Sequence, residues 1–126
     1  MGEIEKKKIE AYVDAYNAFD IGGMLEHLHE NVVFENVTNG QVDLRTEGIS
    51  AFKKQAEKAK QFFSSRHQKI ESWTFDNEIV TIEIDYEGVL AIDLPGGAKA
   101  GDTLAMKGRS EFTFKDDKIS SIKDFS

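Results

Sequence analysis

Apolar positions in the first half of the chain recur mainly at helical spacing. Around residues 9–19 they lie three and four positions apart with charged residues between them, which predicts an amphipathic helix. Residues 20–31 predict a second, short helix with Asp20 as its N-cap, and residues 48–65 carry the clearest helical pattern. The apolar faces of these helices are Ile9, Tyr12, Val13, Tyr16 and Phe19; Met24, Leu25 and Leu28; and Ile49, Phe52, Ala56, Ala59 and Phe63.

Alternating apolar and polar positions predict strands in the rest of the chain. NVVFENV (31–37) and QVDLRTE (41–47) flank Asn39-Gly40, a dipeptide suited to a tight hairpin turn. From residue 66 onward the period is two, which predicts three or four long antiparallel strands. Residues 93–102, with the only proline, form a loop between two of them. One face of the strand 103–114 carries Leu104, Met106, Gly108, Ser110, Phe112 and Phe114.

Glu35 and Asn36 are adjacent polar residues inside the apolar strand 31–37. Neighbours on a strand point to opposite faces, so one of the two should face inward. Because an unpaired buried carboxylate costs far more than a buried amide, Asn36 is predicted inside and Glu35 outside. Two roles stay open for Asn36: an amide satisfied by backbone or water, or a ligand contact.

The order of elements is helix, helix, hairpin, helix and then long strands. Helices gathered on one face of a sheet define an α+β fold. The 126 residues contain no repeat, low-complexity tract or linker, which predicts a single domain over residues 1–126.

Composition narrows the possible classes of function. Apolar residues make up 40% and charged residues 31%, which is typical of a globular protein. The net charge of -7 and the scattered basic residues argue against nucleic acid or an anionic membrane as partner. Without cysteine there are no disulfides, no thiolate catalysis and no zinc site built on cysteine. No apolar run approaches the roughly 20 residues of a membrane span, so a cytoplasmic location is expected.

Four segments together resemble the nuclear transport factor 2-like superfamily, which includes ketosteroid isomerases and SnoaL-like polyketide cyclases. They are AYVDAYNAFD at the first helix, NVVFEN at the first strand, EGISAFKKQ at the third helix and RSEFTFKDDKISSIKDF at the final hairpin. The resemblance implies a cone-shaped curved antiparallel sheet wrapped around the N-terminal set of three helices and enclosing a pocket. It also implies a homodimer formed through the outer sheet face.

The isomerases of this superfamily use a proton-transferring carboxylate, a tyrosine and a protonated aspartic acid inside an apolar cone. The resemblance places the tyrosine at Tyr12, the carboxylate position at Asn36 and the protonated acid position at Ser110. An amide cannot abstract a proton at ordinary pH, and a serine hydroxyl is a weaker donor than a carboxylic acid. The usual isomerase mechanism is therefore not expected. The three residues remain able to orient an oxygen atom of a ligand.

The predicted ligand pocket consists of inward-facing aromatic and polar residues: Tyr12, Tyr16, Phe34, Asn36, Phe52, Ser110 and Phe112. The two tyrosines are either core aromatics or ligand contacts. Gly108 and Ser110 either relieve crowding by their aromatic neighbours or leave a cavity, and the cavity is favoured. Residues of opposite strand phase are predicted on the outer sheet face, in cross-strand ion pairs or a dimer interface: Glu83, Asp85, Glu87, Arg109 and Glu111.

The three histidines do not predict a metal site. His27 and His29 are two residues apart, whereas ligand pairs on a helix sit three or four apart, and His67 is expected at the surface. The glycines in 94–101 follow no strand-to-helix phosphate-binding pattern, so no cofactor is predicted. Trp73 is either a pocket wall or an interface anchor.

Two functions fit these features. The first is binding of a small apolar ligand in a pocket that carries Tyr12, Asn36 and Ser110. The second is an isomerase, cyclase or lyase acting on a small carbonyl-bearing or polyketide-like substrate, which needs a carboxylate elsewhere. Asp14 and Asp124 are the residues to test for that role. A buried carboxylate beside Asn36, with a pKa raised by desolvation, would favour the enzyme.

Overall fold

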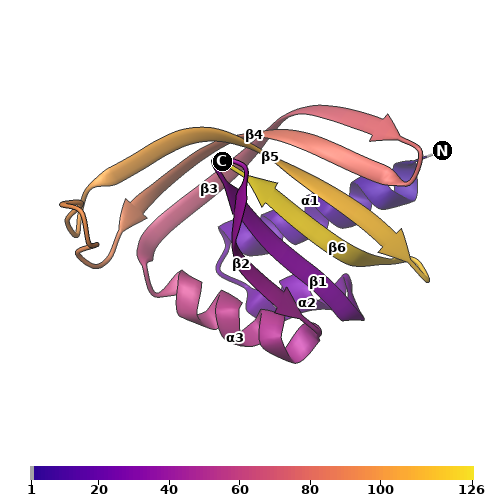
Figure 1. Ribbon diagram of the computed structural model, residues 1–126, viewed down its shortest axis with the longest axis horizontal. Coiled ribbons are helices and arrows are strands. Elements are labelled where there is room, and N and C mark those ends of the chain that lie inside the picture. Colours follow the sequence, from indigo (N-terminus) through magenta and orange to yellow (C-terminus); the bar gives the residue numbers. More distant parts are fainter. Residues whose placement is uncertain (1) are drawn as a thin grey trace.

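Six strands form one strongly curved sheet, and three helices lie on its concave side (Figure 1). The computed structural model describes residues 2–126. In chain order the elements are α1 (Glu3–Asn17), α2 (Ile21–Glu26), β1 (Leu28–Thr38), β2 (Gln41–Glu47), α3 (Ile49–Lys60), β3 (Phe63–Asp76), β4 (Ile79–Leu90), β5 (Thr103–Lys115) and β6 (Lys118–Phe125). The predicted α+β cone is confirmed.

The strands lie in the order β2-β1-β6-β5-β4-β3. Four of the neighbouring pairs are antiparallel, as predicted, but β1 and β6 are parallel. This mixed pairing arises because α3 carries the chain from β2 at one sheet edge to β3 at the other. The strands that follow then return antiparallel to one another, so β6 arrives beside β1 in the same direction.

Two predicted helices are shorter in the structure than their apolar patterns suggest. Leu28, expected on the second helix, is the first residue of β1, because the Ile119 amide donates to the His27 carbonyl and draws this backbone into the sheet. Phe63, expected on the third helix, is the first residue of β3, next to a bond from the Ala91 amide to the Phe62 carbonyl. Sheet hydrogen bonds override helix periodicity at both ends. The Asp20 cap is confirmed, since its side chain accepts from the Gly23 amide at 3.0 Å.

The hairpin turns carry the residues their geometry requires. Asn39 and Gly40 have φ angles of 52° and 80°, and they join Thr38 to Gln41 as the sequence predicts. Positive φ at both central positions is the type I′ arrangement, which matches the right-handed twist of paired strands. The register of β1 and β2 is therefore fixed locally.

The core fills the space between the helices and the concave face of the sheet. Its most enclosed side chains are Phe112, Ile9, Ile82, Leu90, Ile119, Ile122 and Val32. The cluster draws on all three helices and on β1, β4, β5 and β6. This packing holds the elements that line the site in fixed positions.

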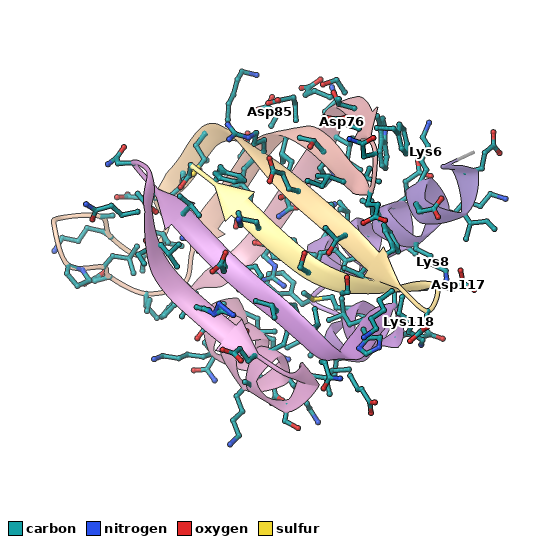
Figure 2. The ribbon with its side chains drawn as sticks, turned by 45° about the vertical axis from the view of Figure 1, so that its right-hand side comes forward. Lys6, Lys8, Asp76, Asp85, Asp117 and Lys118 are labelled. Carbon is teal, nitrogen blue, oxygen red and sulfur yellow. The ribbon has the colours of Figure 1, made fainter. Side chains whose placement is uncertain are left out.

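Charged side chains occupy the outer face of the sheet and the ends of the hairpins. Asp85 lies on the outer side (Figure 2) and pairs with Lys107 at 3.7 Å, as the strand phase predicts. Figure 2 also shows Lys8 and Lys118 beside the β5–β6 turn at Asp117. Lys8 donates to the Asp117 carbonyl, and Lys118 donates to the Glu26 carbonyl at 2.9 Å. These two lysines connect the turn to α1 and to the end of α2.

No helix among residues 2–126 is both long and apolar enough to cross a membrane.

Candidate functional site

A cavity of about 440 Å³ lies between the helices and the concave face of the sheet. Its size is within the range of small-molecule pockets. All seven residues predicted for the pocket line it: Tyr12, Tyr16, Phe34, Asn36, Phe52, Ser110 and Phe112. The sequence did not single out several others, among them Met24, Leu44, Phe63, Arg66, Gln68, Met106 and Phe125. Most of the lining is therefore apolar, with a few polar groups facing one another. The outer-face prediction for Arg109 is wrong in one respect, because its guanidinium lies over the Phe125 ring and the residue also lines the cavity.

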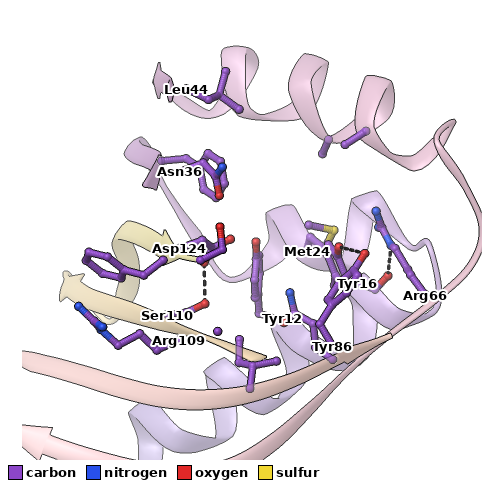
Figure 3. A pocket seen from close by; sticks show the side chains of 18 of the residues that line it. Tyr12, Tyr16, Met24, Asn36, Leu44, Arg66, Tyr86, Arg109, Ser110 and Asp124 are labelled. Atoms are coloured by element: carbon purple, nitrogen blue, oxygen red, sulfur yellow. Dashed lines mark hydrogen bonds between the residues drawn. The ribbon is translucent and has the colours of Figure 1, made fainter. Parts of the chain in front are cut away.

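Three polar residues form one row across the inner face of the sheet. Asn36 on β1 pairs with Asp124 on β6, and Asp124 pairs with Ser110 on β5. All three line the cavity, and Figure 3 shows their side chains close together on one side of it. The row thus places a carboxylate beside Asn36 in the cavity wall.

A β-bulge in β6 turns Asp124 inward. Opposite β5, Phe112 faces Ile122, Thr113 faces Ser121 and Phe114 faces Ile119, so Ser120 is an extra residue in the ladder. A bulge of this kind reverses which side chains face the core beyond it. In a regular strand, every second residue after Ile119 would face inward, and Lys123 would be one of them. The bulge shifts the alternation by one residue, so that Ile122 and Asp124 face inward instead. At the bulge, the hydroxyl of Thr113 is hydrogen-bonded to the hydroxyls of both Ser120 and Ser121, at 2.9 and 2.5 Å.

The carboxyl of Asp124 has a raised pKa. Burial raises the pKa of its carboxyl from the usual 3.8 to about 6, and a hydrogen bond from Ser110 offsets part of that rise. The Ser110 hydroxyl donates to Asp124 Oδ1 at 2.6 Å, a length typical of a hydrogen bond to a charged oxygen. A pKa close to the working pH suits a group that both accepts and returns a proton.

Tyr12 presents a neutral hydroxyl to the same part of the cavity. The residue is 6% exposed, and its hydroxyl points toward Asp124 in Figure 3. Burial, and secondly the charge of Asp124, raise the pKa of Tyr12 far above its usual value. The phenol therefore stays protonated and can donate a hydrogen bond. Within residues 2–126 the Tyr12 hydroxyl has no hydrogen-bond partner, which leaves it free for a ligand oxygen.

Asn36 is held by a neighbour on β2. Its Nδ2 donates to Asp43 Oδ1 at 2.9 Å, and Thr38 donates to the other oxygen of Asp43 at 2.8 Å. These two donors lower the pKa of Asp43, which therefore stays ionised. One N–H of the Asn36 amide is thus bound to a carboxylate rather than to backbone. Glu35 points outward, as predicted, and pairs with Arg45 and Lys123 at 3.4 and 3.6 Å.

Gly108 lies next to Ser110 in the cavity wall, and it serves a packing role that its sequence position does not reveal. A Cβ atom there would lie 2.8 Å from the Phe125 carbonyl oxygen. The absence of a side chain therefore allows the end of β6 to approach β5 closely, and it also leaves room in the cavity. The favoured cavity is thus present, and the crowding that Gly108 relieves comes from the β6 backbone rather than from an aromatic neighbour.

Other predicted positions lie away from the site. Asp14, the second acid to test, is exposed on α1, and His67 is exposed on β3. Trp73 stacks on Phe75 with ring centroids 6.0 Å apart, Lys6 lies over its ring, and it packs against the core without lining the cavity. His29 approaches Asp116 at 3.5 Å. In residues 2–126 no three His, Asp or Glu side chains are placed to hold a metal ion.

The model of the SnoaL-like domain family matches residues 9–122, which is most of the chain. This chain belongs to the SnoaL-like domain family. The resemblance to the nuclear transport factor 2-like superfamily is thereby confirmed. No curated protein matches this SnoaL-like domain in sequence.

Several solved structures share the fold of this SnoaL-like domain. A candidate polyketide cyclase from Xanthomonas campestris pv. campestris is 22% identical with a TM-score of 0.84, over 98% of this chain and 90% of that one. TerC, co-crystallised with polyporic acid, is 17% identical with a TM-score of 0.77, over 97% and 90%. A hypothetical protein from Catenulispora acidiphila with a ketosteroid isomerase-like fold, in complex with trimethylamine, is 15% identical with a TM-score of 0.75, over 94% and 84%. At these identities the likeness establishes the fold.

Proposed function

We propose that this SnoaL-like domain is an enzyme that moves a proton on a small, mostly apolar, carbonyl-bearing molecule, with Asp124 as the acid–base group. The observation that carries the proposal is the inward carboxylate of Asp124, whose pKa burial raises to about 6 in an otherwise apolar cavity. Burial of a carboxylate costs folding free energy, and carboxyl groups with pKa values raised in this way cluster at functional sites. The Xanthomonas neighbour, a candidate polyketide cyclase, supports a substrate of this class.

In the proposed reaction the ionised Asp124 removes a proton from the carbon next to the substrate carbonyl. The C–H bond breaks, its electron pair forms the enolate, and negative charge appears on the carbonyl oxygen. Tyr12 donates a hydrogen bond to that oxygen, which lowers the energy of the charged state. The protonated Asp124 then returns its proton to another atom of the substrate, as in an isomerisation, or protonates the oxygen formed when the enolate attacks a second carbonyl, as in a cyclisation. Ser110 holds the carboxylate in position throughout.

Exchange of carbon-bound protons with solvent tests this proposal directly. The probes are 2-tetralone and 1-phenyl-1,3-butanedione in D₂O, followed by proton NMR. Wild-type protein should speed the loss of the α-proton signal over buffer, and Asp124→Asn should reduce the enzyme-dependent rate by about 10²- to 10⁴-fold. Asp14→Asn, which alters an exposed acid on α1, should keep the wild-type rate.

The outcome that counts against the proposal is equal exchange by wild type and Asp124→Asn. Wild-type protein that binds the ketones without any acceleration over buffer would favour the other predicted function, binding without catalysis. The pH dependence gives a second criterion, because the rate should rise with pH through about 6 as Asp124 ionises.

Three further features belong to the same proposal. We infer that residues 1–126 form a single domain, that two copies associate through the outer sheet face, and that the protein is cytoplasmic. The first is supported by the one core cluster that joins helices and strands. Sedimentation velocity tests the dimer, and a charge reversal at Lys107 on the outer face should weaken it if that face is the interface.

A further inference from the structure

Arg66 is a buried cation in the wall of the cavity. It lies on β3 and is 5% exposed. Arg66 and Gln68, two residues further along the strand, both line the cavity. Its Nε donates to the Tyr16 carbonyl at 3.0 Å, at the end of α1. The guanidinium carbon lies 3.7 Å from the centre of the Tyr16 ring and 4.5 Å from that of Phe19. These contacts fix where the guanidinium lies.

The same contacts do not neutralise the charge of Arg66. The Nη2 group is buried and has no acceptor within residues 2–126, and no carboxylate in that part of the chain pairs with the guanidinium. Arginine keeps its charge at any physiological pH, so it cannot escape the cost of burial by losing a proton. The α1 carbonyls offer only the partial negative charge of a helix end. A buried arginine with unused donors is thus arranged for an anion that the protein itself does not supply.

Two neutral hydroxyls lie beside this cation. Tyr16 and Tyr86 share a hydrogen bond of 3.0 Å between their hydroxyl oxygens, and both line the cavity. Burial is the largest cause that raises the pKa of each, so both remain protonated donors. An anion that accepts from Arg66 could also accept from one of these hydroxyls. This part of the cavity is therefore rich in donors.

Arg66 and Asp124 occupy opposite ends of the site. Figure 3 shows Arg66 on one side and Asp124 on the other, with Tyr12, Tyr16 and Tyr86 between them. Because the cation and the carboxylate are not paired with each other, each is available to a different part of one ligand. A molecule anchored at Arg66 would extend its apolar body along the aromatic wall toward Asp124.

We propose that Arg66 binds an anionic oxygen group of the ligand, either a carboxylate or an ionised enol or phenol, and so selects acidic carbonyl compounds. The inference deepens the proposed function and rests on it in one respect: that the cavity takes up a small molecule. The overall charge of -7 repels anions, so a preference for an anionic ligand has to come from a local cation. Arg66 is the buried cation of the cavity, whereas Arg109, which also lines it, is exposed and lies over the Phe125 ring.

Binding of shape-matched ligand pairs tests this selection without any turnover. The first pair is 2-naphthoate and neutral 2-naphthamide, and the second is 2-hydroxy-1,4-naphthoquinone, ionised at pH 8, and neutral 1,4-naphthoquinone. Isothermal titration calorimetry at pH 8 should show that wild-type protein binds at least one anion about tenfold or more tightly than its neutral partner. The pair that shows the larger ratio identifies the anion as carboxylate or ionised enol.

Variants at Arg66 assign the preference to this side chain. Arg66→Met keeps an unbranched side chain against Tyr16 and should reduce the anion-to-neutral ratio to about one while binding the neutral ligand within about threefold of wild type. Arg66→Lys keeps the charge but loses the planar fork, and should retain part of the ratio. Asp14→Asn, which alters an exposed acid on α1 outside the cavity, is the matched control and should keep the ratio in full.

Equal binding of anion and neutral ligand by wild type overturns the inference, as does an undiminished ratio in Arg66→Met. If Arg66→Met does not fold, as judged by circular dichroism, the wild-type ratio and the Arg66→Lys variant decide the question. A tenfold ratio together with no proton exchange would leave the anion site standing and reject the proposed catalysis. Proton exchange by wild type together with equal binding of anion and neutral ligand would support the proposed catalysis and reject the anion site. Binding of no ligand by wild type would count against both.

Discussion

Replacing Asp124 by asparagine should make the protein more stable at pH 8, although it removes the proposed catalytic group. The carboxyl is surrounded by protein atoms, and burial raises its pKa from 3.8 to about 6. A carboxyl with a raised pKa holds its proton more tightly in the folded than in the unfolded chain. Its contribution to stability is therefore complete below pH 3.8 and is lost as the pH rises through 6.

The size of the effect follows from the shift. Two pKa units correspond to about 3 kcal/mol of unfavourable free energy when Asp124 is ionised. Asp124 keeps some accessible surface on the cavity side, where water screens the charge, so about 2 kcal/mol is the better expectation. Asparagine has nearly the same shape and can still accept the hydrogen bond from Ser110, but it never ionises.

The measurement is urea unfolding of wild type and Asp124→Asn at several pH values between 4 and 8, followed by Trp73 fluorescence. The difference in unfolding free energy should be near zero at pH 4 and should reach about 2 kcal/mol in favour of the variant at pH 8. Other carboxylates titrate in both proteins and cancel in the difference. Asp14→Asn provides the matched control and should show no such trend. A difference that is constant with pH, or an asparagine variant that is less stable at pH 8, would refute the reasoning.

Two further substitutions test the surroundings of Asp124. Ser110→Ala removes the hydrogen-bond donor that lowers the pKa of Asp124, so the pH midpoint of proton exchange should move above 6. An unchanged or lower midpoint would contradict this role of the hydrogen bond. Gly108→Ala places a Cβ 2.8 Å from the Phe125 carbonyl oxygen and should lower the unfolding free energy by about 1 to 3 kcal/mol in urea titrations. Gly22→Ala on α2, where the nearest atom is 3.7 Å away, is its control and should be neutral or slightly stabilising, so equal losses in the two variants would argue against a steric cause.

Local patterns in the sequence are sufficient to predict most of the elements and one wall of the cavity. Alternation is regular along β4 and along residues 108–112 of β5, so the inward positions of Ser110 and Phe112 follow directly from it. The Asn39-Gly40 turn sets the register of β1 on β2 without help from distant residues. Asn36 could be placed inside because the alternative, Glu35, would bury a charge.

The predictions failed where long-range hydrogen bonds compete with a local pattern. Leu28 and Phe63 fit the apolar pattern of a helix. The backbone next to them is instead hydrogen-bonded into the sheet, to β6 at Leu28 and to the end of β4 at Phe63. The same is true of the parallel pair of β1 and β6, since no local signal shows which strand will lie beside which. Helical periodicity is a weak preference, and a ladder of sheet hydrogen bonds outweighs it.

The sequence by itself determined the class of fold, the apolar cavity and the inward residues where the strands alternate regularly. Only the tertiary structure decided the chemistry of that cavity. Asp124 faces inward because Ser120 bulges out of the ladder opposite Thr113, which reverses the phase of β6. Arg66 lies in the wall because the end of α1, about fifty residues earlier, presents the Tyr16 carbonyl and ring to it. The positions of Asp124 and Arg66 both depend on which backbone groups pair across the fold, and the alternation of residues along a single strand does not predict that pairing.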